Sequence, residues 1–201
     1  MNLPVRDTAR RGPAPGSPAG VRMVVGMALL LGLGLLAVAP AGVQAAGKTV
    51  EVHLMMSADG ARAYFDPAGI HIQAGDTVRW VQVANYHSVT AYDPSNDNHE
   101  RRIPDRAKPW DSDILLGEYP AAGSTFEHRF TVEGVYDYYC KPHEAAGMVG
   151  RIVVGKPGDG PGTKHFGYAP GKHWKPVPEI AQKAFPSVEE IMRRGVVPAP
   201  Q

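Results

Sequence analysis

Hydrophobic and polar positions alternate along this chain in short segments separated by turn residues. The clearest segment is 77–83 (Thr-Val-Arg-Trp-Val-Gln-Val), which alternates at a period of two and predicts a half-buried strand. The other segments with strand character are 49–56, 64–65, 70–73, 87–92, 125–131, 135–140 and 149–154. Because no helical pattern separates these segments, their spacing predicts an all-β fold, a two-sheet antiparallel sandwich.

Two regions lie outside this strand pattern. Residues 93–122 are polar and punctuated by proline, and a loop of this length is either functional or ordered by packing. The tail, 156–201, begins with a Pro/Gly-rich linker and carries short helix candidates; Ser187 and Glu190 form a capping-box pattern that predicts a helix over 188–194. We expect one sandwich domain over 46–155 and a C-terminal extension that is not a second domain. This extension either packs on the sandwich or stays mobile, with few contacts across the linker.

The N-terminus has the three-part pattern of a secretory signal. Four arginines precede an uncharged apolar run over 23–38, which is followed by small residues and a cleavage site after Ala45. The alternative is a retained membrane anchor, because 23–39 is near the lower limit of a bilayer span. Either reading places the remaining chain outside the cytoplasm, in the periplasm or secreted. After cleavage we expect no membrane association.

Charge gives no sign of a nucleic-acid partner. The 201-residue chain has a formal charge of +1, and 43% of its residues are hydrophobic, as in ordinary soluble proteins. Removing the four arginines and one aspartate of residues 1–45 from the 21 basic and 20 acidic residues leaves 17 against 19, a balance of −2.

Cys140 is the only cysteine, so it cannot form a disulfide within the chain. In an exported protein a lone cysteine is buried and inert, bridges to another molecule, or binds a metal. Its neighbours favour the metal. Cys140, His143 and Met148 form a Cys-x2-His-x4-Met pattern in the loop between two predicted strands.

These donors favour copper. His87, which opens a predicted strand after a polar turn, is the candidate for the fourth ligand. One thiolate, two imidazoles and a thioether are the donor set of trigonal copper sites with a weak axial methionine. Zinc is the main alternative, but structural zinc sites usually have more than one cysteine and no methionine. The other histidines are interpreted as surface or structural residues.

Several stretches resemble the plastocyanin/pseudoazurin branch of the cupredoxins, and the resemblance covers about 48–155. They are 75–80 (Gly-Asp-Thr-Val-Arg-Trp), 87–89 (His-Ser-Val), 130–140 and the loop ending 148–150. The resemblance implies an eight-stranded Greek-key sandwich and one type 1 copper. It also implies electron shuttling, with His87, Cys140, His143 and Met148 at the positions of the family's ligands.

The chain departs from the family at three points. Ser88 stands where the family usually has asparagine, which leaves the hydrogen bonding around the cysteine sulfur to be determined. The stretch between His87 and Cys140 is longer than in small members, and the tail has no counterpart in them.

Two functions fit these features. The first is a one-electron carrier whose protein redox partners dock near His143, amid a small, weakly polar patch. The second is an extracytoplasmic copper-handling protein that carries, stores or detoxifies the metal. An enzyme is not expected, because catalytic copper proteins need a second, typically histidine-rich site that this sequence does not offer.

Overall fold

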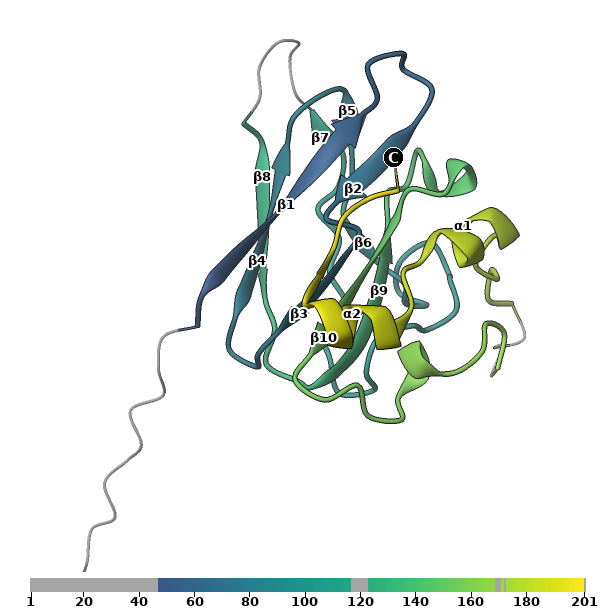
Figure 1. The fold of residues 1–201 in the computed structure, drawn as a ribbon. Coiled ribbons are helices and arrows are strands. Elements are labelled where there is room, and N and C mark those ends of the chain that lie inside the picture. The colour runs from purple at the N-terminus through teal and green to yellow at the C-terminus, as the bar shows by residue number, and fades with distance from the viewer. Residues whose placement is uncertain (1–46, 117–122, 169–170, 172, 201) are drawn as a thin grey trace, which may run out of the picture. The chain divides into compact units, whose positions relative to one another are not determined.

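Two β-sheets pack face to face in the computed structural model, which describes residues 47–116, 123–168, 171 and 173–200 (Figure 1). The first sheet has the order β2-β1-β4-β8 and the second β11-β3-β10-β9-β6. The strands of the first are β1 (Thr49–Met56), β2 (Ala63–Asp66), β4 (Thr77–Gln82) and β8 (Thr125–Arg129). Those of the second are β3 (Gly69–Ile72), β6 (Thr90–Ala91), β9 (Gly134–Tyr139), β10 (Val149–Val154) and β11 (Val196–Val197).

The predicted two-sheet sandwich is confirmed, but its sheets are mixed and not purely antiparallel. β1 pairs with β4 in parallel, and β10 pairs with β3 in parallel. The cause is the path of the chain: it leaves the first sheet after β2, runs through β3 in the second sheet, and returns at β4. Such a crossover brings the returning strand alongside β1 in the same direction.

The predicted signal segment 1–45 lies outside the described residues. In the part of the chain that the structure describes, no helix is long and apolar enough to cross a membrane.

The core lies between the sheets. In β4 the residues Val78, Trp80 and Gln82 are buried and alternate with partly exposed ones, as the period of two predicts. The Trp80 ring meets Tyr138 of the second sheet edge-on, with ring centroids 5.5 Å apart. Cys140 and Met148, two of the candidate metal ligands, belong to the same apolar cluster. The candidate site is therefore continuous with the core.

The segment expected as one strand, 87–92, is broken into two. β5 (Tyr86–His87) pairs with β7 (Leu115–Leu116), a strand that the sequence pattern did not indicate, whereas β6 pairs with β9. Between them, the Ser88 N–H donates to the Cys140 sulfur and the Val89 N–H to Ser112 Oγ. These two amides therefore serve the site and not a strand ladder.

The tail covers the outer face of the second sheet, so the expectation of few contacts across the linker is wrong. It carries a 3₁₀ turn, η2 (Pro161–Thr163), the helices α1 (Glu179–Ala184) and α2 (Val188–Arg194), and β11, which pairs antiparallel with β3. The predicted helix 188–194 is confirmed, with Ser187 Oγ accepting the Glu190 N–H at 3.0 Å. Since the tail shields it, β10 is buried along its whole length.

Apolar side chains of the tail pack on this face in two clusters. One joins Val177 and Ala181 to Tyr92, Tyr139 and Val149, and the other joins Ile191 and Val197 to Val135 and Val153. All of these residues are buried. Of the two expected arrangements of the tail, the structure therefore has the one that packs on the sandwich.

A buried ion-pair cluster lies under the same layer. The fully buried carboxylate of Asp137 accepts hydrogen bonds from Arg151 Nε at 2.7 Å and Arg102 Nε at 3.2 Å. The tail completes both guanidinium groups, because the carbonyls of Pro186 and Gly162 accept from Arg151 and Arg102. Each buried charge thus has partners, as burial requires.

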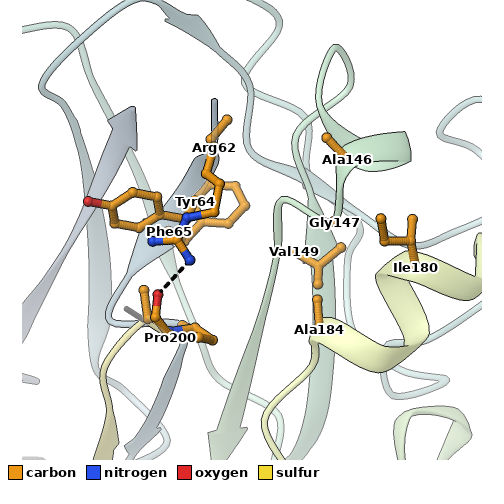
Figure 2. Close-up of a pocket in the computed structure, with 12 residues that line it drawn as sticks. Arg62, Tyr64, Phe65, Ala146, Gly147, Val149, Ile180, Ala184 and Pro200 are labelled. Carbon is orange, nitrogen blue, oxygen red and sulfur yellow. Dashed lines mark hydrogen bonds between the residues drawn. The ribbon is translucent and has the colours of Figure 1, made fainter. Parts of the chain in front are cut away.

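The tail also reaches the loop that carries the candidate ligands. A cavity of about 170 Å³ lies beside that loop, where Ala146 and Gly147 face Ile180 and Ala184 of α1 (Figure 2). A Cβ added at Gly147 would lie 3.6 Å from Ala184 Cβ, an ordinary packing distance. α1 therefore supports the loop from the outside.

Candidate metal centre

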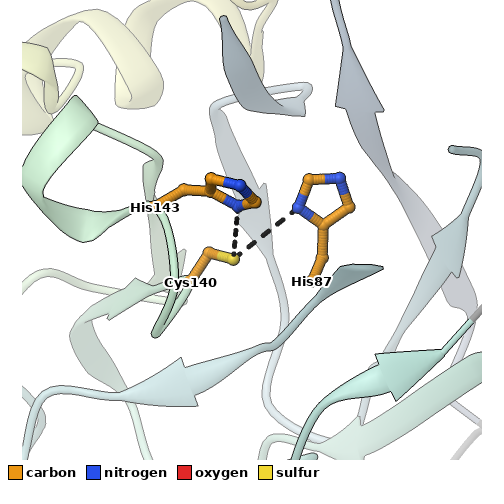
Figure 3. A group of neighbouring side chains, drawn as sticks. All are labelled: His87, Cys140 and His143. Atoms are coloured by element: carbon orange, nitrogen blue, oxygen red, sulfur yellow. Dashed lines mark hydrogen bonds between the residues drawn. The ribbon is translucent and has the colours of Figure 1, made fainter. Parts of the chain in front are cut away.

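His87 enters the site at the end of β5, where the β5–β7 pair holds its backbone opposite Leu115. The side chain is fully buried, and its ring centroid lies 5.0 Å from that of His143 (Figure 3). Asn85, just before β5, has a left-handed backbone with φ of 65°, a conformation that asparagine tolerates better than most residues. This turn brings the chain into β5 immediately ahead of the histidine.

The other candidates lie on a loop that closes on itself between β9 and β10. The Cys140 N–H donates to the Met148 carbonyl, and the Met148 N–H to the His143 carbonyl, both at 3.1 Å. A 3₁₀ turn, η1 (Glu144–Ala146), fills the loop, and Gly147 ends it with φ of +87°, which favours glycine. The backbone itself therefore holds these residues in place.

Three donor atoms converge in this arrangement (Figure 3). Cys140 Sγ lies 3.7 Å from His87 Nδ1 and 3.4 Å from His143 Nδ1, and all three atoms lie within 4.8 Å of one another. With metal bonds of about 2.0–2.3 Å, three donors around one ion are about 3.5–4 Å apart. The side chains present therefore fit a single metal ion.

Met148 lies in the same loop, fully buried. Its backbone hydrogen bonds with Cys140 and His143 hold it beside these two residues, and it belongs to the same apolar cluster as Cys140. Its assignment as a ligand comes from the sequence motif and stays a prediction.

Burial sets the protonation of the donors. It lowers the pKa of His87 to about 4, with a further contribution from repulsion by His143, and it lowers the pKa of His143 as well. It raises the pKa of the Cys140 thiol to about 11, against the opposing effect of the Ser88 hydrogen bonds. At neutral pH both imidazoles are therefore neutral with free lone pairs, and the thiol must lose its proton to bind a metal.

One side of the site approaches the surface. His143 is only partly buried, and the ring of Tyr86, which is 49% exposed, lies 5.6 Å from it between centroids. His87 and Cys140 are shielded from solvent. Of the three converging donors, His143 is therefore the one most accessible to solvent.

The other histidines do not join this group among the residues that the structure describes. His99, for example, is buried against Glu144, with His99 Nε2 3.4 Å from the carboxylate, and His71 Nε2 is 2.9 Å from the Gly155 carbonyl oxygen. Their interpretation as surface or structural residues agrees with these contacts.

Sequence reasoning missed the residues that brace the site from the 93–122 segment. Ser112 Oγ accepts the Val89 N–H at 2.8 Å, and Asp111 accepts from the Thr90 hydroxyl at 3.1 Å. Tyr86 was also missed as a neighbour of His143. No periodic or local pattern marks Asp111 and Ser112, because their partners lie 21 to 23 residues away along the chain.

Comparison with known proteins identifies the family. The model of the "Copper binding proteins, plastocyanin/azurin family" matches residues 50–155. Plastocyanin of Synechococcus is 36% identical over 128 residues (63% of this chain, 88% of the relative), and chloroplastic plastocyanin of Tetradesmus obliquus is 32% identical over 119 residues (58% and 76%). A pseudoazurin structure from Sinorhizobium is 25% identical to this chain, with a TM-score of 0.49. The match spans 74% of this chain and 98% of the pseudoazurin. This chain is therefore a cupredoxin of the plastocyanin/azurin family, with copper as its cofactor.

Proposed function

We propose that this protein is a one-electron carrier with a single type 1 copper held by His87, Cys140, His143 and Met148. The observation that carries the proposal is the convergence of two imidazole nitrogens and one buried thiol within 4.8 Å. His87 comes from β5, whereas Cys140 and His143 lie on a loop closed by its own backbone hydrogen bonds. Thiolate and thioether donors suit Cu(I), and imidazoles suit both oxidation states.

Copper supplies the exchange of one electron between Cu(I) and Cu(II), and the protein supplies rigidity and access. The hydrogen bonds from Cys140 to Met148 and from Met148 to His143 keep the loop in one shape. A site that rearranges little when its charge changes loses little energy at each transfer. The sandwich excludes water from the Cys140 side, so the exposed edge at His143 is where we place the docking of redox partners.

The proposal includes the organisation of the chain. Residues 1–45 form a signal peptide, 46–155 the copper-binding domain and 156–201 a C-terminal extension, and the mature protein is periplasmic or secreted. It has no catalytic activity of its own. Pro142 and Ala145, exposed beside His143, give the docking surface its weakly polar character.

Electron self-exchange of the copper protein tests this function against copper handling. We expect a reversible potential and fast self-exchange through the His143 edge. Because like charges repel at a docking surface, Tyr86→Lys should slow self-exchange by about tenfold or more at low salt. Tyr168→Lys, at an exposed tyrosine of the tail, is the matched control and should change the rate little.

The opposite outcome identifies a copper-handling protein. In that case, self-exchange would be slow in both the unmodified protein and the variants, and the protein would readily lose copper to a Cu(I) chelator.

A further inference from the structure

Four polar residues beside the site form a closed ring of hydrogen bonds, which we call the polar ring: Ser88, Thr90, Asp111 and Lys141. Ser88 Oγ lies 3.1 Å from Thr90 Oγ1, and Thr90 Oγ1 lies 3.1 Å from Asp111 Oδ1. The Asp111 carboxylate pairs with the Lys141 ammonium, and the Lys141 backbone N–H returns to Ser88 Oγ at 2.8 Å. The hydrogen bond to Asp111 raises the pKa of the Lys141 amine, which keeps it charged.

The direction of every hydrogen bond in the polar ring follows from which groups have a proton to donate. A carboxylate only accepts, so the Thr90 hydroxyl must donate to Asp111. Thr90 then has no proton left for Ser88, and the Ser88 hydroxyl must donate to Thr90 while it accepts from Lys141. Each hydroxyl donates once and accepts once in the same sense, an arrangement in which the bonds strengthen one another.

The polar ring joins three segments that meet only in the folded chain. Ser88 directly follows the ligand candidate His87, Lys141 directly follows Cys140, and Asp111 comes from the 93–122 segment. Ser88 and Thr90 are fully buried, and the side chains of Asp111 and Lys141 are 24% and 27% exposed. Water therefore competes weakly for the two hydroxyl groups at its centre.

This arrangement holds the backbone amide of Ser88 against the sulfur of Cys140. The Ser88 N–H donates to Cys140 Sγ at 3.3 Å, while the Ser88 hydroxyl is held from both sides by Thr90 and Lys141. Moving Ser88 away from the sulfur would break the bonds on both sides of its hydroxyl.

We propose that Thr90 and Asp111 are positioning residues for the copper centre: through the polar ring they hold the Ser88 amide on the Cys140 sulfur. This role rests on the proposed function and gives the 93–122 segment a part in it. A hydrogen bond to the sulfur withdraws charge from it and so favours Cu(I) over Cu(II). Weakening the polar ring therefore lowers the potential.

The first test uses the metal-free protein, where no property of copper enters. Thr90→Val removes the hydroxyl and keeps the shape, whereas Thr90→Ser keeps the hydroxyl. Amide hydrogen exchange of Ser88 and Lys141 should be about tenfold faster or more in Thr90→Val, the equivalent of one buried hydrogen bond, and near the original rate in Thr90→Ser. Unchanged exchange of both amides in Thr90→Val would overturn the proposal.

The second test uses the copper-loaded protein. Thr90→Val should lower the potential, shift the thiolate-to-copper absorption band and weaken copper binding by about tenfold, and Thr90→Ser should restore all three. Asp111→Asn also removes a charge, so Asp113→Asn, two residues away and exposed, is its control. The potential of Asp111→Asn should lie below that of Asp113→Asn.

The outcomes separate this proposal from the proposed function. If the unmodified protein lacks the thiolate-to-copper band, the function is wrong, and hydrogen exchange still tests the polar ring. If the band is present but neither Thr90→Val nor Asp111→Asn moves it or the potential relative to the controls, the polar ring has no positioning role.

Discussion

Packing of the tail on the sandwich can be measured at one contact, that of Gly69 in β3 with Ile191 in α2. Ile191 is fully buried in the cluster with Val135, Val153 and Val197. A Cβ added at Gly69 would lie 2.8 Å from two Ile191 side-chain atoms and 2.7 Å from Pro186 Cγ. The Ile191 side chain therefore fills the space that a side chain at position 69 would need.

The magnitudes follow from this geometry. Ile191→Ala should lower the free energy of unfolding by about 2–3 kcal/mol, the lower part of the usual range, because a short surface helix can partly collapse onto the cavity. Gly69→Ala should cost about 1–3 kcal/mol through overpacking. Since Ile191→Ala removes two of the three clashing atoms, the double variant should cost about 1 kcal/mol less than the two single changes together.

Urea unfolding of the metal-free protein measures all four free energies. Ile180→Ala, the same substitution at a residue of α1 that is 51% exposed, is the control and should change stability little. If Ile191→Ala has as small an effect as Ile180→Ala, or if the double variant is simply additive, the tail does not pack on β3 as described.

Three further results are expected. Asp137→Ala should lower the free energy of unfolding by about 3–5 kcal/mol, because it leaves the buried Arg102 and Arg151 without their carboxylate partner. Removal of the exposed Glu179 carboxylate should have little effect, and an equally small effect for Asp137→Ala would contradict the buried cluster. Copper(I) affinity should rise about tenfold per pH unit between pH 7 and 9, because only the Cys140 thiol, with its pKa of about 11, must then lose a proton. Competition titrations in which the affinity does not change with pH would exclude the thiol as a ligand. Met148→Leu should retain copper and raise the potential measured by voltammetry, because loss of a weak donor disfavours Cu(II) more than Cu(I), and complete loss of copper would refute an axial role.

Local patterns predicted much of this protein correctly. The expected strand 49–56 is β1 and the expected helix 188–194 is α2, because each is encoded by periodicity or capping within a few residues. Two of the three converging donors, Cys140 and His143, were found because they share one contiguous motif. His87 was proposed from its context alone, at the start of an expected strand after a polar turn, and the family resemblance implies the same residue.

Long-range contacts were not predictable in this way. Asp137 is buried with Arg102 and Arg151 because the tail covers them, and this contact joins segments that lie far apart along the chain. One signal was available, since 135–140 is almost continuously apolar, a pattern typical of a strand buried on both faces. The contact of Asp111 with Thr90 and Lys141 left no such trace, because it joins positions 21 and 30 residues apart.

The absorption spectrum of the Cu(II)-loaded protein, compared with that of Cys140→Ser, tests the central claim most directly. Intense visible colour arises from charge transfer between a cysteine sulfur and the copper bonded to it, and Cys140 is the only cysteine in the chain. We predict an intensely blue or green protein and a colourless Cys140→Ser variant that remains folded. A colourless unmodified protein, or a variant that keeps the colour, would contradict the assignment of Cys140 as a copper ligand.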